Sequence, residues 1–148
     1  MNYAHGIPFC SVSIGLVVDG RPAVGVVLDP IAGELFSAVA DGPAELNGRP
    51  IQASTQVRPA DLLVSSDAAP RGRLLGSAAL ELCYVASGRL DAFIQAGRLS
   101  NWDVAAAGLI AERAGASLAL VPEGAWFELD RAPGFGLTVT SPAYRQGA

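Results

Sequence analysis

The chain has little of what nucleic-acid-binding and membrane-spanning proteins need. Only 16% of its 148 residues are charged and the formal net charge is −4, so no Lys/Arg stripe is present to neutralise nucleic-acid phosphates. No uninterrupted apolar run approaches the length of a membrane span, and no basic-then-apolar signal peptide opens the sequence. We therefore expect a soluble, cytoplasmic protein that binds neither nucleic acid nor membrane.

Histidine and cysteine are also scarce. The single histidine, His5, rules out a zinc site built from several histidines. Its place in a loop beside Gly6 and Pro8 favours a structural role over that of a general base. Cys10 and Cys83 are far apart in apolar surroundings, with no Cys-x-x-Cys motif. We expect two buried free thiols rather than a disulfide or a metal site.

Apolar residues, by contrast, make up 51% of the chain, which argues against disorder and suits one domain with a substantial core. The first third predicts an antiparallel meander. Residues 10–18 alternate at first and then become apolar throughout, which predicts a strand buried on both faces. Turns at Asp19-Gly20 and residues 30–33 separate it from strands at 23–29 and 34–40.

The rest of the chain alternates helices with strands. Apolar positions between Gly76 and Gly88 predict a helix from 77 to 87 that packs between layers. A second helix is predicted over 102–114. The remaining predicted features are a reversal at Asn47-Gly48, loops at 54–61 and 67–73, and strands at 62–65, 90–95, 117–121 and 137–140. This order predicts a layered α/β sandwich.

One carboxylate, Asp103, falls in the first turn of the apolar helix that begins Asn101-Trp-Asp-Val-Ala. First-turn acids are favoured because free backbone N–H groups and the positive end of the helix dipole lie close by. A capping role behind Ser100 or Asn101 therefore competes with a role as a metal ligand.

Three stretches of sequence together favour the metal-ligand interpretation of Asp103. They are Asn2-Tyr-Ala-His-Gly-Ile-Pro-Phe-Cys-Ser-Val-Ser-Ile-Gly-Leu16, Gly76-Ser-Ala-Ala-Leu-Glu-Leu-Cys-Tyr-Val-Ala-Ser-Gly-Arg-Leu-Asp-Ala-Phe93, and the Trp102-Asp-x-Ala segment. In content, order and spacing the chain resembles the inositol monophosphatase family of magnesium-dependent phosphatases. The likeness covers essentially all 148 residues but only the back half of a family domain.

The resemblance implies an inositol-phosphatase-like fold that is truncated at the N-terminus. Residues 1–148 would be a partial domain of alternating α/β/α/β/α layers, without the first helical layer and the opening hairpin. The family's Glu-Glu pair and Asp-Pro-x-Asp-Gly-Thr motif, which supply most metal ligands, would lie upstream. We expect a fragment or an internal methionine taken as the start, with a genuinely truncated protein as the alternative.

The resemblance also implies a substrate site. Asp103 would ligate Mg²⁺ and lie near the substrate hydroxyl beside the ester. Gly76, Ser77 and Ala78 would face polyol hydroxyls from a helix start. Gln95 falls where inositol-specific members usually carry a glutamate, and one extra residue separates it from Asp103. Both departures leave room for another sugar phosphate or for histidinol phosphate.

The implied function is a Mg²⁺-dependent phosphomonoesterase that hydrolyses a small polyol or sugar phosphate and is a homodimer when complete. One carboxylate cannot build a site for several metals, so we expect the chain alone to be inactive. The alternatives are a non-catalytic remnant acting as a binding or dimerisation module, a histidinol-phosphate phosphatase, and a relative of the bisphosphate nucleotidases or fructose-bisphosphatases. Without the rest of the domain, Val12, Leu80 or Tyr84 should be unusually exposed.

Overall fold

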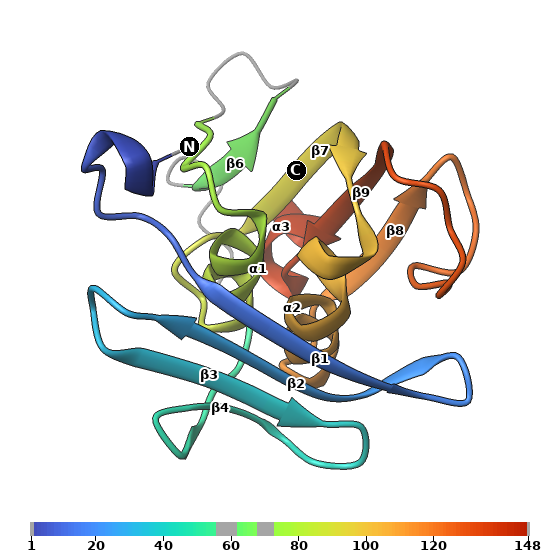
Figure 1. Ribbon diagram of the computed structural model, residues 1–148, viewed down its shortest axis with the longest axis horizontal. Coiled ribbons are helices and arrows are strands. Elements are labelled where there is room, and N and C mark those ends of the chain that lie inside the picture. The colour runs from blue at the N-terminus through green and yellow to red at the C-terminus, as the bar shows by residue number, and fades with distance from the viewer. Residues whose placement is uncertain (1, 56–61, 68–72, 148) are drawn as a thin grey trace.

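The computed structural model describes residues 2–55, 62–67 and 73–147. Two β-sheets enclose helices α1 and α2, so the layers run β/α/β (Figure 1). The elements are η1 (Tyr3–His5), β1 (Val12–Val18), β2 (Arg21–Asp29), β3 (Glu34–Val39), β4 (Ala44–Leu46), β5 (Arg49–Pro50), β6 (Val64–Ser66), α1 (Ala78–Ala86), β7 (Ala92–Leu99), α2 (Asn101–Arg113), β8 (Ser117–Val121), β9 (Phe135–Thr140) and α3 (Pro142–Gly147). The predicted layered α/β sandwich is confirmed.

The first sheet is the predicted antiparallel meander, with strand order β1-β2-β3-β4-β5. Asp19 and Gly20 have φ values of 50° and 76°, and Asn47 and Gly48 have 50° and 74°. Both pairs therefore occupy the left-handed region that tight hairpin turns require. The reversals predicted at these two positions are confirmed.

Helix α2 lies close against this sheet because glycines line its path. A Cβ added to Gly25 of β2 would lie 2.6 Å from the backbone oxygen of Ala106, and one added to Gly15 of β1 would lie 3.0 Å from the Ala105 Cβ. Small residues on both elements thus let the backbones approach. The helix buries all residues from Val104 to Ala111.

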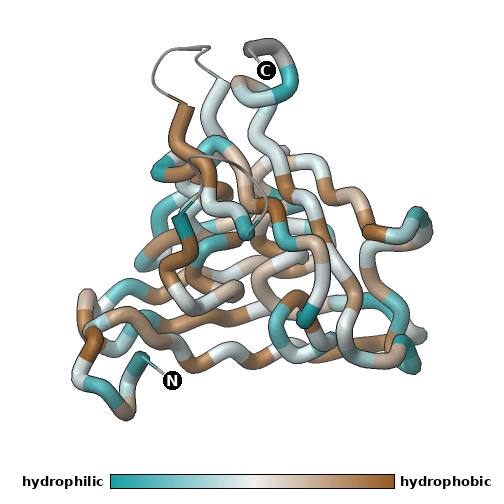
Figure 2. Tube along the Cα trace, turned by 90° about the horizontal axis from the view of Figure 1, so that it is seen from above, coloured by the Kyte–Doolittle hydropathy of each residue, from teal (hydrophilic) through white to brown (hydrophobic). Residues whose placement is uncertain are grey.

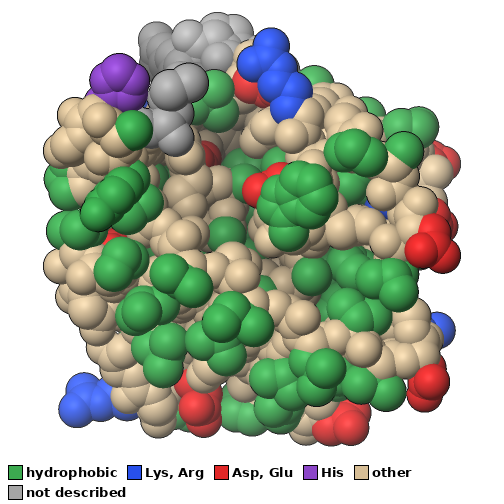
Figure 3. Space-filling view, in the orientation of Figure 1, with side chains coloured by type: hydrophobic (Ala, Val, Ile, Leu, Met, Phe, Trp, Pro, Cys, Tyr) green, Lys and Arg blue, Asp and Glu red, His purple; other side chains and the backbone are tan. Residues whose placement is uncertain are grey.

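The prediction that the first strand is buried on both faces is wrong. Val12, Ile14, Leu16 and Val18 alternate along β1 and are 51%, 64%, 54% and 48% exposed. Alternate residues of a strand point to opposite sides, so α2 covers one face and no described element covers the other. Figure 3 shows hydrophobic side chains gathered along the course of β1. We call these four residues, with Leu35 and Val39 of β3, the outer apolar face.

Helix α1 is less exposed than the sequence predicted. Leu80 is fully buried and Tyr84 is half-buried, so only the exposure expected for Val12 is confirmed. The reason is that α1 lies between the two sheets and packs on α2, so its apolar surface is satisfied within the chain. Tyr84 also meets the ring of Phe9 edge-on, with centroids 5.7 Å apart.

The second sheet has the order β6-β7-β9-β8, with β6 parallel to β7 and the other pairs antiparallel. The predicted strand at 90–95 extends to Leu99, because β7 continues past a break in register between Gln95 and Leu99. Of the predicted loops at 54–61 and 67–73, residues 56–61 and 68–72 lie outside the described residues.

In Figure 2 hydrophobic residues concentrate along the strands and inner helices, and hydrophilic ones at turns. The starts of α1 and α2, which follow β6 and β7, lie near one another at one side of the molecule (Figure 1). No helix in the described parts of the chain is long and apolar enough to cross a membrane.

Candidate active site

Two adjoining hollows bring together all five residues of the predicted site. The Asp103 hollow, of about 410 Å³, is lined by Gly76, Ser77, Ala78 and Asp103 together with residues of the N-terminal segment. The Gln95 hollow, of about 220 Å³, is lined by Gly76, Ala78, Gln95 and Asp103 among others. Gly76, Ala78 and Asp103 line both, so the two hollows form one continuous site at the starts of α1 and α2.

The start of α1 is held by two side chains. Ser77 caps the helix, with its hydroxyl accepting from the Leu80 N–H at 3.5 Å. Gly76 has a φ of 95°, and an added Cβ there would lie 2.6 Å from the Asn2 Nδ2. That Asn2 amide donates to the Phe9 and Leu75 carbonyls at 2.9 and 2.8 Å, which ties the N-terminal segment to the segment before α1. A side chain at position 76 would disturb both.

Asp103 has the capping contact that its position predicts. Its Oδ2 accepts from the Ser100 N–H at 2.8 Å, while Oδ1 has no hydrogen bond with any described residue. Burial raises the pKa of the Asp103 carboxyl above its ordinary value, and the bond from Ser100 opposes that rise. One oxygen therefore caps the helix, and the other is left for a ligand in the hollow.

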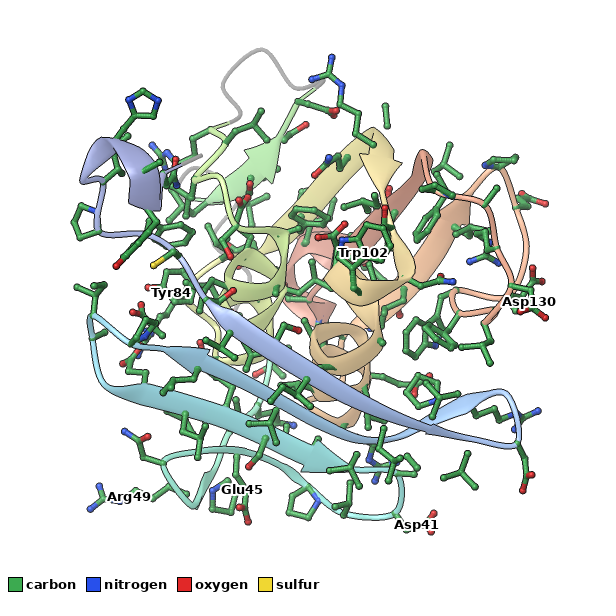
Figure 4. All side chains as sticks on the ribbon, in the orientation of Figure 1. Asp41, Glu45, Arg49, Tyr84, Trp102 and Asp130 are labelled. Carbon is green, nitrogen blue, oxygen red and sulfur yellow. The ribbon has the colours of Figure 1, made fainter. Side chains whose placement is uncertain are left out.

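Gln95 presents an acceptor to its hollow. Its Nε2 donates to the Gly97 carbonyl at 2.9 Å, which orients the amide and leaves Oε1 as the free group. Arg98 lines the same hollow and has a φ of 72°. The exposed indole of Trp102 stands at the start of α2 (Figure 4) and lines the Asp103 hollow.

Metal-binding capacity is limited in the described residues. Asp67, Glu81 and Asp103 line the Gln95 hollow, but Asp67 accepts from the Ala96 N–H at 3.1 Å and Glu81 is engaged by backbone groups. No group of three or more His, Cys, Asp or Glu within the described ranges is placed to hold a metal ion. Asp103 fits as one oxygen ligand, and a hard cation such as Mg²⁺ needs several.

Glu81 is a site residue that the sequence reasoning missed. It is 2% exposed, and its Oε1 accepts from the N–H groups of Gly76 and Ser77 at 2.9 and 3.2 Å. The Ser65 hydroxyl contacts its other oxygen. Through these bonds Glu81 holds the backbone of the Gly76–Ala78 segment in place. The signal was available, because a lone acid inside an otherwise apolar helix needs buried partners.

His5 and the two cysteines lie outside the centre of the site or on its edge. His5 is exposed in η1 and does not line either hollow. Both cysteines are free, as predicted, but Cys10 is only half-buried and lines the Asp103 hollow. Burial raises the pKa of the Cys83 thiol. A separate hollow of about 450 Å³ beside Trp126 contains none of the predicted site residues.

Comparison with known proteins identifies the family of the chain. The sequence model of the inositol monophosphatase family matches residues 1–137. The chain belongs to the inositol monophosphatase family. Within that family it is 40% identical to Inositol monophosphatase 2 of Solanum lycopersicum, over 86% of this chain and 56% of that protein. It is 41% identical to Nus factor SuhB of Haemophilus influenzae, over 77% of this chain and 50% of that protein.

Solved structures of family members agree. The extragenic suppressor protein SuhB of Bartonella henselae matches with a TM-score of 0.84 and 30% identity, covering 98% of this chain and 63% of that one. The inositol monophosphatase of Anabaena matches with a TM-score of 0.77 and 34% identity, covering 98% of this chain and 66% of that one. The chain spans about half the length of the curated relatives it matches.

Proposed function

We propose that residues 1–148 form part of a Mg²⁺-dependent phosphomonoesterase that hydrolyses a small polyol or sugar phosphate. The observation that carries the proposal is the convergence of Asp103, Gln95 and the Gly76–Ala78 segment on two adjoining hollows. Membership in a family of phosphatases supports phosphate-ester hydrolysis as the reaction. The cytoplasm stays the expected compartment, in keeping with two free cysteines.

Each residue has a role that follows from its contacts. The free Oδ1 of Asp103 supplies one oxygen to a Mg²⁺ ion, which when bound polarises phosphoryl oxygens and stabilises the leaving alkoxide. Glu81 occupies the N–H groups of Gly76 and Ser77, so the Ala78 N–H, at the first helical position, is left to meet a substrate hydroxyl. The Gln95 Oε1 accepts from a second hydroxyl.

The chain alone should release no phosphate, because its described residues offer Asp103 without a metal-binding group around it. We propose that further family residues complete the ligand set and that the complete protein is a homodimer. The test compares phosphate release from a sugar phosphate, with and without Mg²⁺, by the 148-residue chain and by a longer form that restores any in-frame upstream residues. Activity should need the longer form, and Mg²⁺-dependent release by the 148-residue chain would contradict this.

The second candidate is a non-catalytic binding or dimerisation module. The outer apolar face favours it, since Ile14 at 64% exposure and its neighbours suit a partner surface. A longer form that stays inactive with Mg²⁺ while a defined oligomer forms through this face would favour the module over the enzyme.

A further inference from the structure

Arg98 occupies an unusual backbone position in the Gln95 hollow. The pairing of β7 with β9 shifts register between Gln95 and Leu99, and Arg98 sits in that break with a φ of 72°. A left-handed conformation is costly for a long side chain and is adopted readily only by Gly, Asn or Asp. Non-glycine residues held this way are found preferentially where a side chain has a task.

The Arg98 side chain is exposed. It has no ion pair or hydrogen bond with any residue in the ranges that the structure describes. Four other arginines have partners: Arg89 with Glu34, Arg131 with Glu128, Arg113 with the Gly42 carbonyl, and Arg145 with the Ser117 hydroxyl. The side chains of Arg21, Arg49 and Arg73 have none among the described residues, but these three do not line the Gln95 hollow. A cation that lines a hollow without a partner is available to a ligand.

Arg98 is the one cationic residue among the described residues that line this hollow, and three acids line it as well. The acids of the hollow are engaged: Asp67 by the Ala96 N–H, Glu81 by the start of α1 and Asp103 by the Ser100 N–H. The nearest predicted substrate contact is the neutral amide of Gln95. The wall formed by Gln95 and Arg98 therefore offers an acceptor oxygen and a cationic fork, while Asp103 keeps its Oδ1 free for the metal.

We propose that Arg98 is a specificity-determining residue that binds a second anionic group, phosphate or carboxylate, on the phosphorylated substrate. This rests on the proposed function, since it assumes that the phosphoester is held beside Asp103. The planar guanidinium suits either anion with two parallel hydrogen bonds. The same cation repels amines, which weighs against histidinol phosphate.

A metal-free binding experiment tests this on the 148-residue chain. Isothermal titration compares three ligands on one scaffold: glucose 1-phosphate, glucose 1,6-bisphosphate and glucuronic acid 1-phosphate. The variants are Arg98→Asn, which tolerates the left-handed backbone without the charge, and Arg98→Lys, which keeps the charge. Arg49→Asn is the matched control, because Arg49 is exposed in β5 at the far edge of the first sheet (Figure 4).

We expect one or both doubly anionic ligands to bind at least about tenfold more tightly than glucose 1-phosphate, as a charge-assisted contact predicts. Arg98→Asn should abolish that preference, Arg98→Lys should keep part of it, and Arg49→Asn should keep it all. The ligand that shows the preference tells phosphate from carboxylate. Equal binding of all three ligands, no measurable binding, or a preference that survives Arg98→Asn would overturn the proposal.

The kinetic experiment separates this inference from the proposed function. In the active longer form, Arg98→Asn should raise KM for the preferred doubly anionic substrate about tenfold, and this effect should exceed its effect on glucose 1-phosphate. Equal effects on both substrates overturn the role of Arg98 alone. If the longer form releases no phosphate with Mg²⁺ from any ligand, the proposed function fails, while the binding result still decides whether Arg98 recognises an anion.

Discussion

Glu81 gives the sharpest test of how the substrate side of the site is built. Glu81→Ala removes the acceptor of the Gly76 and Ser77 N–H groups, and the side chain it deletes is 2% exposed. The Ser65 hydroxyl can still donate to the Arg73 carbonyl at 2.8 Å, so two unpaired peptide donors and a small cavity are left. At about 1 kcal/mol for each, the free energy of unfolding should fall by about 3 kcal/mol.

The matched control is Glu81→Gln. Its Oε1 can still accept from both N–H groups, and its amide nitrogen can donate to the Ser65 hydroxyl, so the change should be under about 1 kcal/mol. Thermal denaturation followed by circular dichroism should show a Tm roughly 10 °C lower for Glu81→Ala only. Amide exchange at Gly76 and Ser77 should quicken in the same variant. Equal Tm values for wild type and Glu81→Ala, or equal damage by both variants, would refute the reasoning.

Three further predictions follow from burial and exposure. In size-exclusion chromatography the 148-residue chain should self-associate through the outer apolar face, and Ile14→Lys should shift it toward monomer. Trp102→Lys, at a more exposed position outside that face, should not, and a clean wild-type monomer contradicts the prediction. In native protein a thiol reagent should label Cys10 and spare Cys83, whose thiol burial keeps protonated; rapid labelling of both contradicts this. Burial raises the pKa of Asp103, so the fold favours the neutral carboxyl, and wild-type stability falls as the pH rises from the ordinary Asp pKa of about 4 through the raised pKa. In urea denaturation Asp103→Asn should therefore be at least as stable as wild type at pH 7, and this advantage should shrink at pH 3. Lower stability of the variant at pH 7 would contradict the prediction.

Local sequence patterns predicted the turns and helices whose formation depends on neighbouring residues alone. The hairpins at Asp19-Gly20 and Asn47-Gly48 depend on residues that tolerate a left-handed backbone, and both formed as expected. The helices at 78–86 and 101–113 follow from apolar runs between helix stops and caps. The five predicted site residues came together because Gly76, Ser77 and Ala78 lie at the start of α1, Asp103 lies in the first turn of α2, and Gln95 lies in β7, the strand that leads into α2.

What could not be predicted depends on contacts between distant parts of the chain. The apolar residues of β1 do not say whether a layer covers each face, so the exposure of Ile14 needed the structure. The continuation of β7 past Gln95 needed the partner strand β9, whose register shows where Arg98 is inserted. Glu81 could be marked as odd from its apolar neighbours, but its partners at Ser65 and Gly76 are brought near only by the fold.

The central claim is that Asp103 supplies a catalytic metal ligand as well as a helix cap. The most direct measurement is the Mg²⁺-dependent release of phosphate by the active longer form carrying Asp103→Asn, with Asp130→Asn as the control at an exposed position away from the hollows (Figure 4). The amide can keep the bond from the Ser100 N–H, so the fold should be intact while kcat falls at least about a hundredfold and Asp130→Asn stays at wild-type activity. If Asp103→Asn keeps wild-type turnover and Mg²⁺ dependence, Asp103 is a cap alone and the account is wrong.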